Sequence, residues 1–212
     1  GALFWMFRYL ERSENLARLI EAGLRMALTR SDSATQEWGS VLTTVGLAQA
    51  YKETQQGFEP SLVVNFLLRG RNHGGSVYAM IERARDNARI ARTAITREVW
   101  EATNECYIHI RDAMARPLRD ADLPHVLGMI RQHSALVRGA LHGTMLRNDI
   151  YNFARLGTFL ERADNTARII DVKYYLLLPS VAHIGTSIDN VQWETILRSV
   201  SAHRAYHWLY GT

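Results

Sequence analysis

Residues 3–28 read LFWMFRYLERSENLARLIEAGLRMAL, and the spacing within this stretch indicates the fold class of the chain. Its apolar residues recur every three or four positions, which is the period of a helix that buries one face. These residues are Met6, Tyr9, Leu10, Leu16, Ala17, Ile20, Leu24, Ala27 and Leu28. We therefore predict a long amphipathic helix that ends at the polar residues 29–33.

Similar spacing continues along most of the chain, interrupted by short polar or Gly/Pro segments. It predicts further helices at about 34–55, 76–95, 96–115, 124–141, 149–178 and 190–209. Residues 62–68 are a short apolar run that periodicity assigns to neither helix nor strand. With few runs of alternating polarity, the sequence predicts an all-α multi-helix bundle of about seven helices. No low-complexity linker divides it, so we expect a single α-helical domain over residues 1–212.

The composition excludes several classes of protein. Hydrophobic residues make up 47% and charged residues 22% of the 212 residues, as in an ordinary globular domain and unlike a disordered chain. The single cysteine, Cys106, cannot form an internal disulfide. The apolar run at 174–178 is far shorter than the roughly 18 residues of a membrane span, and the first residues show no signal-peptide pattern. We therefore expect a cytoplasmic protein that does not interact with membranes.

The net charge is +4, and almost all of the basic residues are arginines. Lys52 and Lys173 are the only lysines among 25 basic residues. Guanidinium groups suit bidentate pairing with carboxylates or phosphates. The arginines between positions 83 and 97 alternate with acidic residues, whereas nucleic-acid-binding proteins usually gather their basic residues in one stripe. We therefore expect no nucleic-acid partner.

An eight-residue polar pattern, E-R-x-x-N/D-x-A-R, occurs three times in the predicted helices. The copies are residues 11–18 (ERSENLAR), 82–89 (ERARDNAR) and 161–168 (ERADNTAR). Internal repetition indicates related structural units, and the first and third copies are the most similar. We expect these two helices to lie side by side, related by an approximate twofold axis.

Helix geometry places three positions of each copy on one face. The Glu, the Asn or Asp four residues later and the Arg seven residues later form a polar stripe two turns long. Within one helix this Glu and Arg are roughly 10 Å apart along the axis, too far for a direct pair. We therefore predict that Glu11, Glu82 and Glu161 each accept a hydrogen bond from an arginine of another helix. The favoured donors are Arg18, Arg89 and Arg168.

The stripes have three possible interpretations: solvated outer faces, an interlocked polar core that fixes helix register, or a ligand site. Asparagine is unfavourable in the middle of a helix, so its recurrence at positions 15 and 165 favours a specific hydrogen-bonding role. The candidate functional residues are Glu11, Arg12, Asn15, Arg18, Glu82, Arg83, Asp86, Asn87, Arg89, Glu161, Arg162, Asp164, Asn165 and Arg168.

Several blocks of the sequence resemble the Alpha-E family, bacterial predicted α-helical domains named for an E-R motif. The blocks are LFWM at 3–6 with RYLER at 8–12, ARDNAR at 84–89, EVWE at 98–101, LERAD at 160–164, DVKY at 171–174 and LRS at 197–199. They follow the family's order over nearly the whole chain. One departure is Phe7, where the family usually has glycine, which puts a close backbone approach there in doubt.

The resemblance implies a place in a peptide ligation or modification system. Family members are associated, by gene neighbourhood and fusion, with ATP-grasp-type ligases and transglutaminase-like proteases, which are therefore the expected partners. Family members are also commonly longer at the C-terminus, which implies further helices that this chain lacks. The resemblance assigns no catalytic residue, and we expect no cofactor.

Two other groups of residues could carry chemistry. His203 and His207 lie four residues apart, a spacing that can bind a metal ion on a helix. No acidic residue lies close to them in the sequence, so we interpret them as ordinary surface histidines and expect no metal site. Cys106 and His109 lie on one predicted helix, and we interpret them as an incidental pair and not as a nucleophile with its base.

These observations lead to three hypotheses of function. The first is an accessory or partner-binding protein of a peptide ligation or modification system. The second is an enzyme of the same system whose polar stripes bind a carboxylate- or amide-bearing substrate, and it requires a pocket with perturbed carboxylates. The third is a purely structural polar core with the function elsewhere, in which the stripes pair with one another and leave no cavity.

Overall fold

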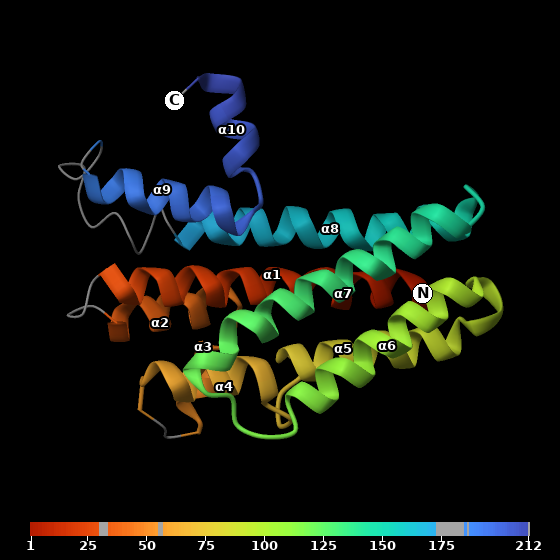
Figure 1. Ribbon diagram of the computed structural model, residues 1–212, viewed down its shortest axis with the longest axis horizontal. Helices are drawn as coiled ribbons and strands as arrows, with labels where there is room; N and C mark the ends of the chain where they lie inside the picture. Colours follow the sequence, from red (N-terminus) through yellow and green to blue (C-terminus); the bar gives the residue numbers. More distant parts are fainter. Residues whose placement is uncertain (30–33, 55–56, 173–184, 186, 212) are drawn as a thin grey trace.

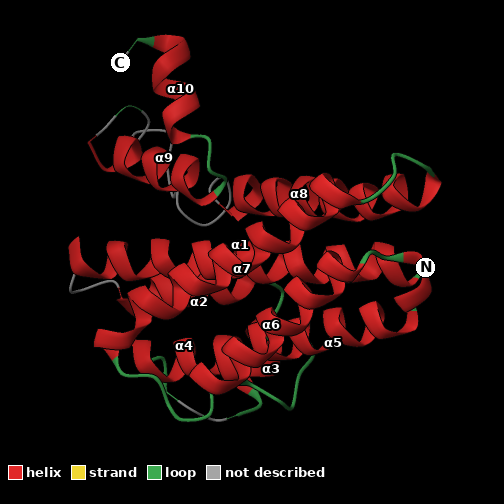
Figure 2. Cartoon of the chain, turned by 45° about the vertical axis from the view of Figure 1, so that its right-hand side comes forward, coloured by secondary structure: helices red, strands yellow, loops and turns green. Residues whose placement is uncertain are grey.

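The structure is a computed structural model that describes residues 1–29, 34–54, 57–172, 185 and 187–211. The described residues form ten α-helices and no strand, which confirms the predicted all-α class (Figures 1 and 2). The helices are α1 (Ala2–Thr29), α2 (Ala34–Thr44), α3 (Ala48–Lys52), α4 (Pro60–Arg69), α5 (Val77–Ile90), α6 (Arg97–Ala113), α7 (Leu123–Thr144), α8 (Asp149–Val172), α9 (Ser187–Ser199) and α10 (His203–Tyr210). None of these described helices is long and apolar enough to cross a membrane.

Helix α1 is the central element, as the length of its apolar pattern predicts. It packs on α8 on one side and on α5 and α7 on the other, with α2 beside its C-terminal half (Figure 1). Because neighbours surround it, α1 buries residues on nearly all sides, among them Met6, Phe7, Leu10, Ala17 and Ile20. The chain then passes through α5 and α6 to α7, which packs on both α6 and α1 and leads to the start of α8.

Helices α1 and α8 run in the same direction and approach each other closely (Figure 1). One close backbone contact is at Gly157, where an added Cβ would lie only 2.3 Å from the carbonyl oxygen of Phe4. Only glycine fits this backbone contact without displacing a helix. Phe7 of α1 is buried in the core, so the glycine of this contact belongs to α8 and not to α1.

Two predicted helices are each divided into two, and in both cases the break contains a residue with positive φ. The helix expected at 34–55 ends at Thr44, and Gly46 (φ +72°) turns the chain into α3. The helix expected at 190–209 is interrupted at Ser201 (φ 59°), which separates α9 from α10. A left-handed residue ends helical hydrogen bonding, and a single sequence gives little sign of it when the residue is not glycine.

Residues 62–68, the short apolar run that periodicity could not assign, form part of the helix α4. Pro60 occupies the first turn of α4, where its missing N–H removes no hydrogen bond. Four residues of α4 are buried at helical spacing: Val63, Val64, Leu67 and Leu68. This pattern matches one helix face and excludes a strand.

Hydroxyl side chains cap two of the described helices. The Thr96 hydroxyl accepts a hydrogen bond from the Val99 amide (3.4 Å) and caps α6. Ser76 caps α5 in the same way by accepting from the amide of Ala79 (3.2 Å). Helix α8 is described as far as Val172, and the predicted continuation over 173–178 lies outside the described residues.

Candidate functional site

The first and third copies of the octet meet in the contact between α1 and α8. Arg12 of α1 donates two hydrogen bonds to Glu161 of α8, from Nε (2.5 Å) and from Nη2 (2.9 Å). In return, Nε of Arg162 on α8 donates to Glu11 on α1 (2.7 Å). Each E-R dipeptide therefore pairs with the other dipeptide. This confirms that the two helices lie side by side, and the exchange is reciprocal, as a twofold relation requires.

The parallel course of the two helices explains why adjacent residues make the exchange. Successive residues of a helix are about 100° apart around its axis. When each glutamate faces the neighbouring helix, the arginine next to it lies at the edge of the contact and can reach across. The predicted donors, which lie seven residues after each glutamate, were therefore wrong: Arg18 and Arg168 do not donate to Glu161 and Glu11.

Those predicted donors pair within their own helices. Arg18 donates to Glu14 one turn before it, and Arg168 donates to Asp164 (2.9 Å). Arg89 lies 3.8 Å from Asp86 on an exposed face. Three- and four-residue spacings satisfy these arginines locally, which leaves the inter-helix positions to the arginines beside the glutamates.

The two E-R dipeptides belong to a larger cluster of ion pairs between α1, α7 and α8. Two arginines and one glutamate of this cluster were not among the candidate residues. Arg8 donates through Nε to Glu161 (2.8 Å), and Arg138 of α7 contacts both Glu11 (3.4 Å) and Glu14. Glu14 lies three residues after Glu11, and this spacing was a usable signal because it places both on one side of α1. Nothing in the sequence indicated Arg138, because the crossing of α7 over α1 brings it there.

The glutamates of this cluster are removed from water, whereas most of their partners are not. Glu11, Glu14 and Glu161 are 1%, 1% and 2% exposed. The hydrogen bond to Glu161 raises the pKa of Arg12 above its ordinary value, so this guanidinium stays charged. Buried carboxylates are tolerated only when they are paired, and here each of the three accepts from at least one arginine.

The second copy of the octet does not join the cluster. Helix α5 turns Ile81, Ala84 and Ala88 toward its neighbours, which directs most of the polar residues of the copy toward solvent. Within the part of the chain that the structure describes, no arginine pairs with Glu82, so the prediction for that glutamate was wrong. Glu82, Asp86 and Arg89 of this copy are exposed, and the side chain of Asn87 donates to the carbonyl oxygen of Arg83 in its own helix.

Arg83 is the exception in the second copy. Its Nη1 donates to the carbonyl oxygen of Gly74 (3.2 Å), and its guanidinium lies 5.9 Å from the ring centre of Tyr9. This position brings Arg83 from α5 toward the α1–α8 pair, where it lines a cavity.

That cavity lies between α1, α5, α8 and the turn that follows α2, and its volume is about 500 Å³. Its apolar lining residues are Leu16, Leu19, Val45, Leu47 and Met80. Its polar lining includes seven of the candidate residues, which are Arg12, Asn15, Arg83, Glu161, Asp164, Asn165 and Arg168.

The two recurring asparagines lie at the centre of this arrangement. Asn15 and Asn165 line the large cavity and also a second cavity of about 140 Å³, which Val200 and Ser201 close. Asn15 is 5% exposed, and its amide nitrogen has no hydrogen-bond partner within the described structure. A buried donor without a partner is costly, typically by about 1–3 kcal/mol, so this amide needs a partner that the described residues do not supply.

The other candidate groups differ in their geometry. Cys106 is fully buried, and burial raises the pKa of its thiol to about 12, which rules out a reactive thiolate at neutral pH. His109 stacks on His133 (ring centres 4.9 Å apart) and does not serve as its base. His203 and His207, by contrast, bring their Nε2 atoms to 3.1 Å, and the fold places Glu194 beside them.

A comparison with known families found a match over the whole chain. Residues 1–212 match the family Alpha-E, described as a predicted alpha-helical domain with a conserved ER motif. The searches of curated proteins and of solved structures found no match. The dipeptides at 11–12 and 161–162 fit that description, and their reciprocal pairing gives them a structural role in joining α1 to α8. The chain therefore belongs to the Alpha-E family.

Proposed function

We propose that this protein is a binding component of a peptide ligation or modification system, and that its large cavity receives a peptide carrying a free carboxylate. One observation carries the proposal: Asn15 lines the cavity, and its buried amide nitrogen has no partner within the described structure. A peptide carbonyl oxygen that reaches this nitrogen from the cavity would satisfy the donor. Asn165, which also lines the cavity, offers a second amide for the peptide backbone.

The charges of the cavity favour an anionic group. Among the three arginines that line it, Arg12 pairs with Glu161 and Arg168 pairs with Asp164. Arg83 contacts a carbonyl oxygen and pairs with no described carboxylate. The cavity therefore holds one unmatched positive charge, and a carboxylate can accept two hydrogen bonds from such a guanidinium.

The size and the apolar lining residues of the cavity favour a peptide over a small inorganic anion. A volume of about 500 Å³ is typical of sites that enclose a ligand of several residues or a small organic molecule. Leu16, Leu47 and Met80 contribute apolar surface to the lining. A side chain of the bound peptide would pack there while its backbone faces the asparagines.

A binding role has more support than catalysis by these residues. Both carboxylates that line the cavity, Glu161 and Asp164, already accept hydrogen bonds from arginines. A general base needs a lone pair that is directed at the substrate, whereas these carboxylates direct lone pairs at guanidinium groups. The E-R exchange therefore fits the structural hypothesis, and the asparagines and Arg83 fit the binding hypothesis.

The test is a binding measurement with N-terminally fluorescein-labelled tripeptides, each made with a free C-terminal carboxylate and as the C-terminal amide. Fluorescence polarisation should detect binding of the carboxylate forms. Arg83→Gln and amidation of the peptide should each weaken binding on the order of tenfold or more, as expected for loss of a charge-assisted hydrogen bond. Arg89→Gln is the matched control, because it removes an exposed arginine from the same helix.

The outcomes separate the hypotheses. Asn15→Leu should also lose binding while the protein stays folded, because it removes an unpaired donor and not an internal contact. Equal binding of the carboxylate and amide forms, or equal losses in the two arginine variants, would contradict a carboxylate site. If no tripeptide binds, the unpaired amide of Asn15 does not mark a peptide site, and the proposal for the cavity is overturned.

The partners rest on the resemblance to the family and need their own experiment. We propose an ATP-grasp-type ligase as the direct partner, with a transglutaminase-like protein in the same system. The test is co-elution in size-exclusion chromatography of this chain with a purified ATP-grasp-type ligase of the same organism. Separate elution at concentrations of tens of micromolar would contradict a stable complex.

A further inference from the structure

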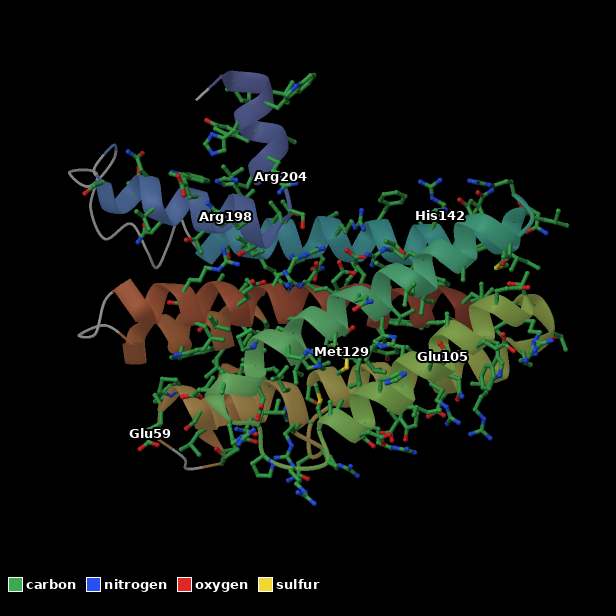
Figure 3. The ribbon with its side chains drawn as sticks, viewed as in Figure 1. Glu59, Glu105, Met129, His142, Arg198 and Arg204 are labelled. Atoms are coloured by element: carbon green, nitrogen blue, oxygen red, sulfur yellow. The ribbon has the colours of Figure 1, made fainter. Side chains whose placement is uncertain are left out.

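A separate group of potential ligands lies where α9 meets α10, away from the cavity. In Figure 3, Arg198 marks the end of α9 and Arg204 the beginning of α10, and the two helices form a corner above α8. Three side chains converge there: Glu194 from α9 and the two histidines of α10, His203 and His207. Their ligand atoms lie within 4.8 Å of one another.

The separation of the two histidine rings is close to the one that a metal ion requires. Their four-residue spacing places both rings on one face of α10, with the Nε2 atoms 3.1 Å apart and the ring centres 4.4 Å apart. In a tetrahedral site with Zn–N bonds of about 2.0–2.1 Å, two ligand nitrogens are about 3.3 Å apart. Only a small opening of the pair would admit an ion.

Glu194 supplies the third ligand that the sequence spacing did not reveal. It lies nine residues before His203, on a different helix, and the break at Ser201 folds the two helices together. Its carboxylate is 3.5 Å from Arg198, and both side chains are about half exposed. Exposed ion pairs of this kind contribute little, so the carboxylate can exchange the arginine for a cation.

We propose that Glu194, His203 and His207 bind one divalent transition-metal ion of the Zn²⁺ class, with at least one coordination position left to water. Two imidazoles and one carboxylate suit Zn²⁺, Co²⁺ or Ni²⁺, whereas Ca²⁺ and Mg²⁺ prefer sets made only of oxygen ligands. Three protein ligands leave the site open, which is the arrangement of exchangeable and catalytic ions and not of closed structural sites.

The surroundings support the neutral form of the imidazole that coordinates metal. Partial burial, the nearby charge of Arg198 and His207 together lower the pKa of His203 below its ordinary value, and only Glu194 acts in the opposite direction. At neutral pH the ring therefore needs to release no proton before it binds an ion. A bound ion would also link α9 to α10 across Ser201 and fix the angle of the corner.

The experiment is isothermal titration of the full chain with ZnCl₂, followed by Co²⁺ titration monitored by visible absorption. We expect one ion per chain and a d–d spectrum of four- or five-coordinate cobalt. His203→Gln should weaken binding by at least the roughly 10–100-fold that follows loss of an outer partner of a metal site. His133→Gln is the matched control, because His133 belongs to the other close histidine pair, with His109.

Two variants of α9 distinguish the proposed set from a simple histidine pair. Glu194→Gln should weaken Zn²⁺ binding, and Arg198→Gln should strengthen it by releasing the carboxylate. Both residues are exposed, so these changes should leave the fold intact. Unchanged affinity in Glu194→Gln would overturn the three-ligand site. Absence of a bound ion, or equal losses in His203→Gln and His133→Gln, would overturn the proposal as a whole.

Discussion

Replacing Glu161 by alanine tests whether the reciprocal E-R exchange holds α1 and α8 together. The change removes three hydrogen bonds, two from Arg12 and one from Arg8. Breaking a buried charge pair by removing one partner typically costs about 3–5 kcal/mol. The side chains of Arg8 and Arg12 are 21% and 41% exposed and can be hydrated again, so we place the loss at the lower end, about 3 kcal/mol.

Urea unfolding followed by circular dichroism gives the measurement. With a denaturant dependence of about 2 kcal/mol per molar, a loss of about 3 kcal/mol lowers the midpoint by about 1.5 M. Glu82→Ala is the matched control, because Glu82 holds the same position of the octet but is exposed, and its loss should stay within about 0.5 kcal/mol. If Glu161→Ala and Glu82→Ala have the same midpoint, the exchange does not stabilise the fold and our reasoning is refuted.

Three further predictions concern other parts of the molecule. Gly157→Ala should destabilise the protein by about 1–3 kcal/mol, because its Cβ would meet the Phe4 carbonyl oxygen. Gly139→Ala, which meets nothing within 4 Å in helix α7, should instead stabilise it by about 0.5–1 kcal/mol, and chemical denaturation of both variants compares them. Cys106, whose thiol pKa is raised to about 12, should resist a thiol-reactive dye at pH 8 until urea unfolds the chain, and rapid labelling of the native protein would contradict its burial. Burial lowers the pKa of His73 below 6.5, so its contribution to stability is complete above pH 6.5 and is lost as the pH falls through the lower, folded value. Denaturation curves should show a smaller pH dependence between 7 and 5 in His73→Gln than in the parent protein.

The contact between the first and third octets could be predicted from the sequence because the two octets are so similar. Near-identical segments with the same neighbouring apolar residues imply equivalent environments, and Glu11 and Glu161 are indeed both buried and paired across helices. The identity of the donors could not be predicted in the same way. The distance along the helix axis shows only which residues of one helix can reach each other. The choice between Arg12 and Arg18 as donor depends on how α1 and α8 are rotated relative to each other.

The second octet shows how the same residues acquire a different role. Its glutamate, Glu82, lies in the same local sequence as Glu11, yet one is exposed and the other is buried. Helix α1 is surrounded by neighbours, whereas α5 lies at the edge of the bundle. The eight residues of the octet are too similar in the two helices to indicate this difference. The position of Arg138, which depends on the crossing of α7, is likewise a property of the assembled helices.

The partners in the reciprocal exchange are 149 and 151 residues apart in the chain. At a synthesis rate of about 5–20 residues per second, α1 leaves the ribosome about 8–30 s before the arginine of α8 with which it pairs. Until then, water and Arg138 of α7 are the partners open to the Glu11 carboxylate. Packing of α5, α6 and α7 shortens the loop between α1 and α8 and so lowers the entropic cost of the exchange. A chain that ends before α8 cannot make the exchange, so the two E-R dipeptides join only when α8 has been synthesised.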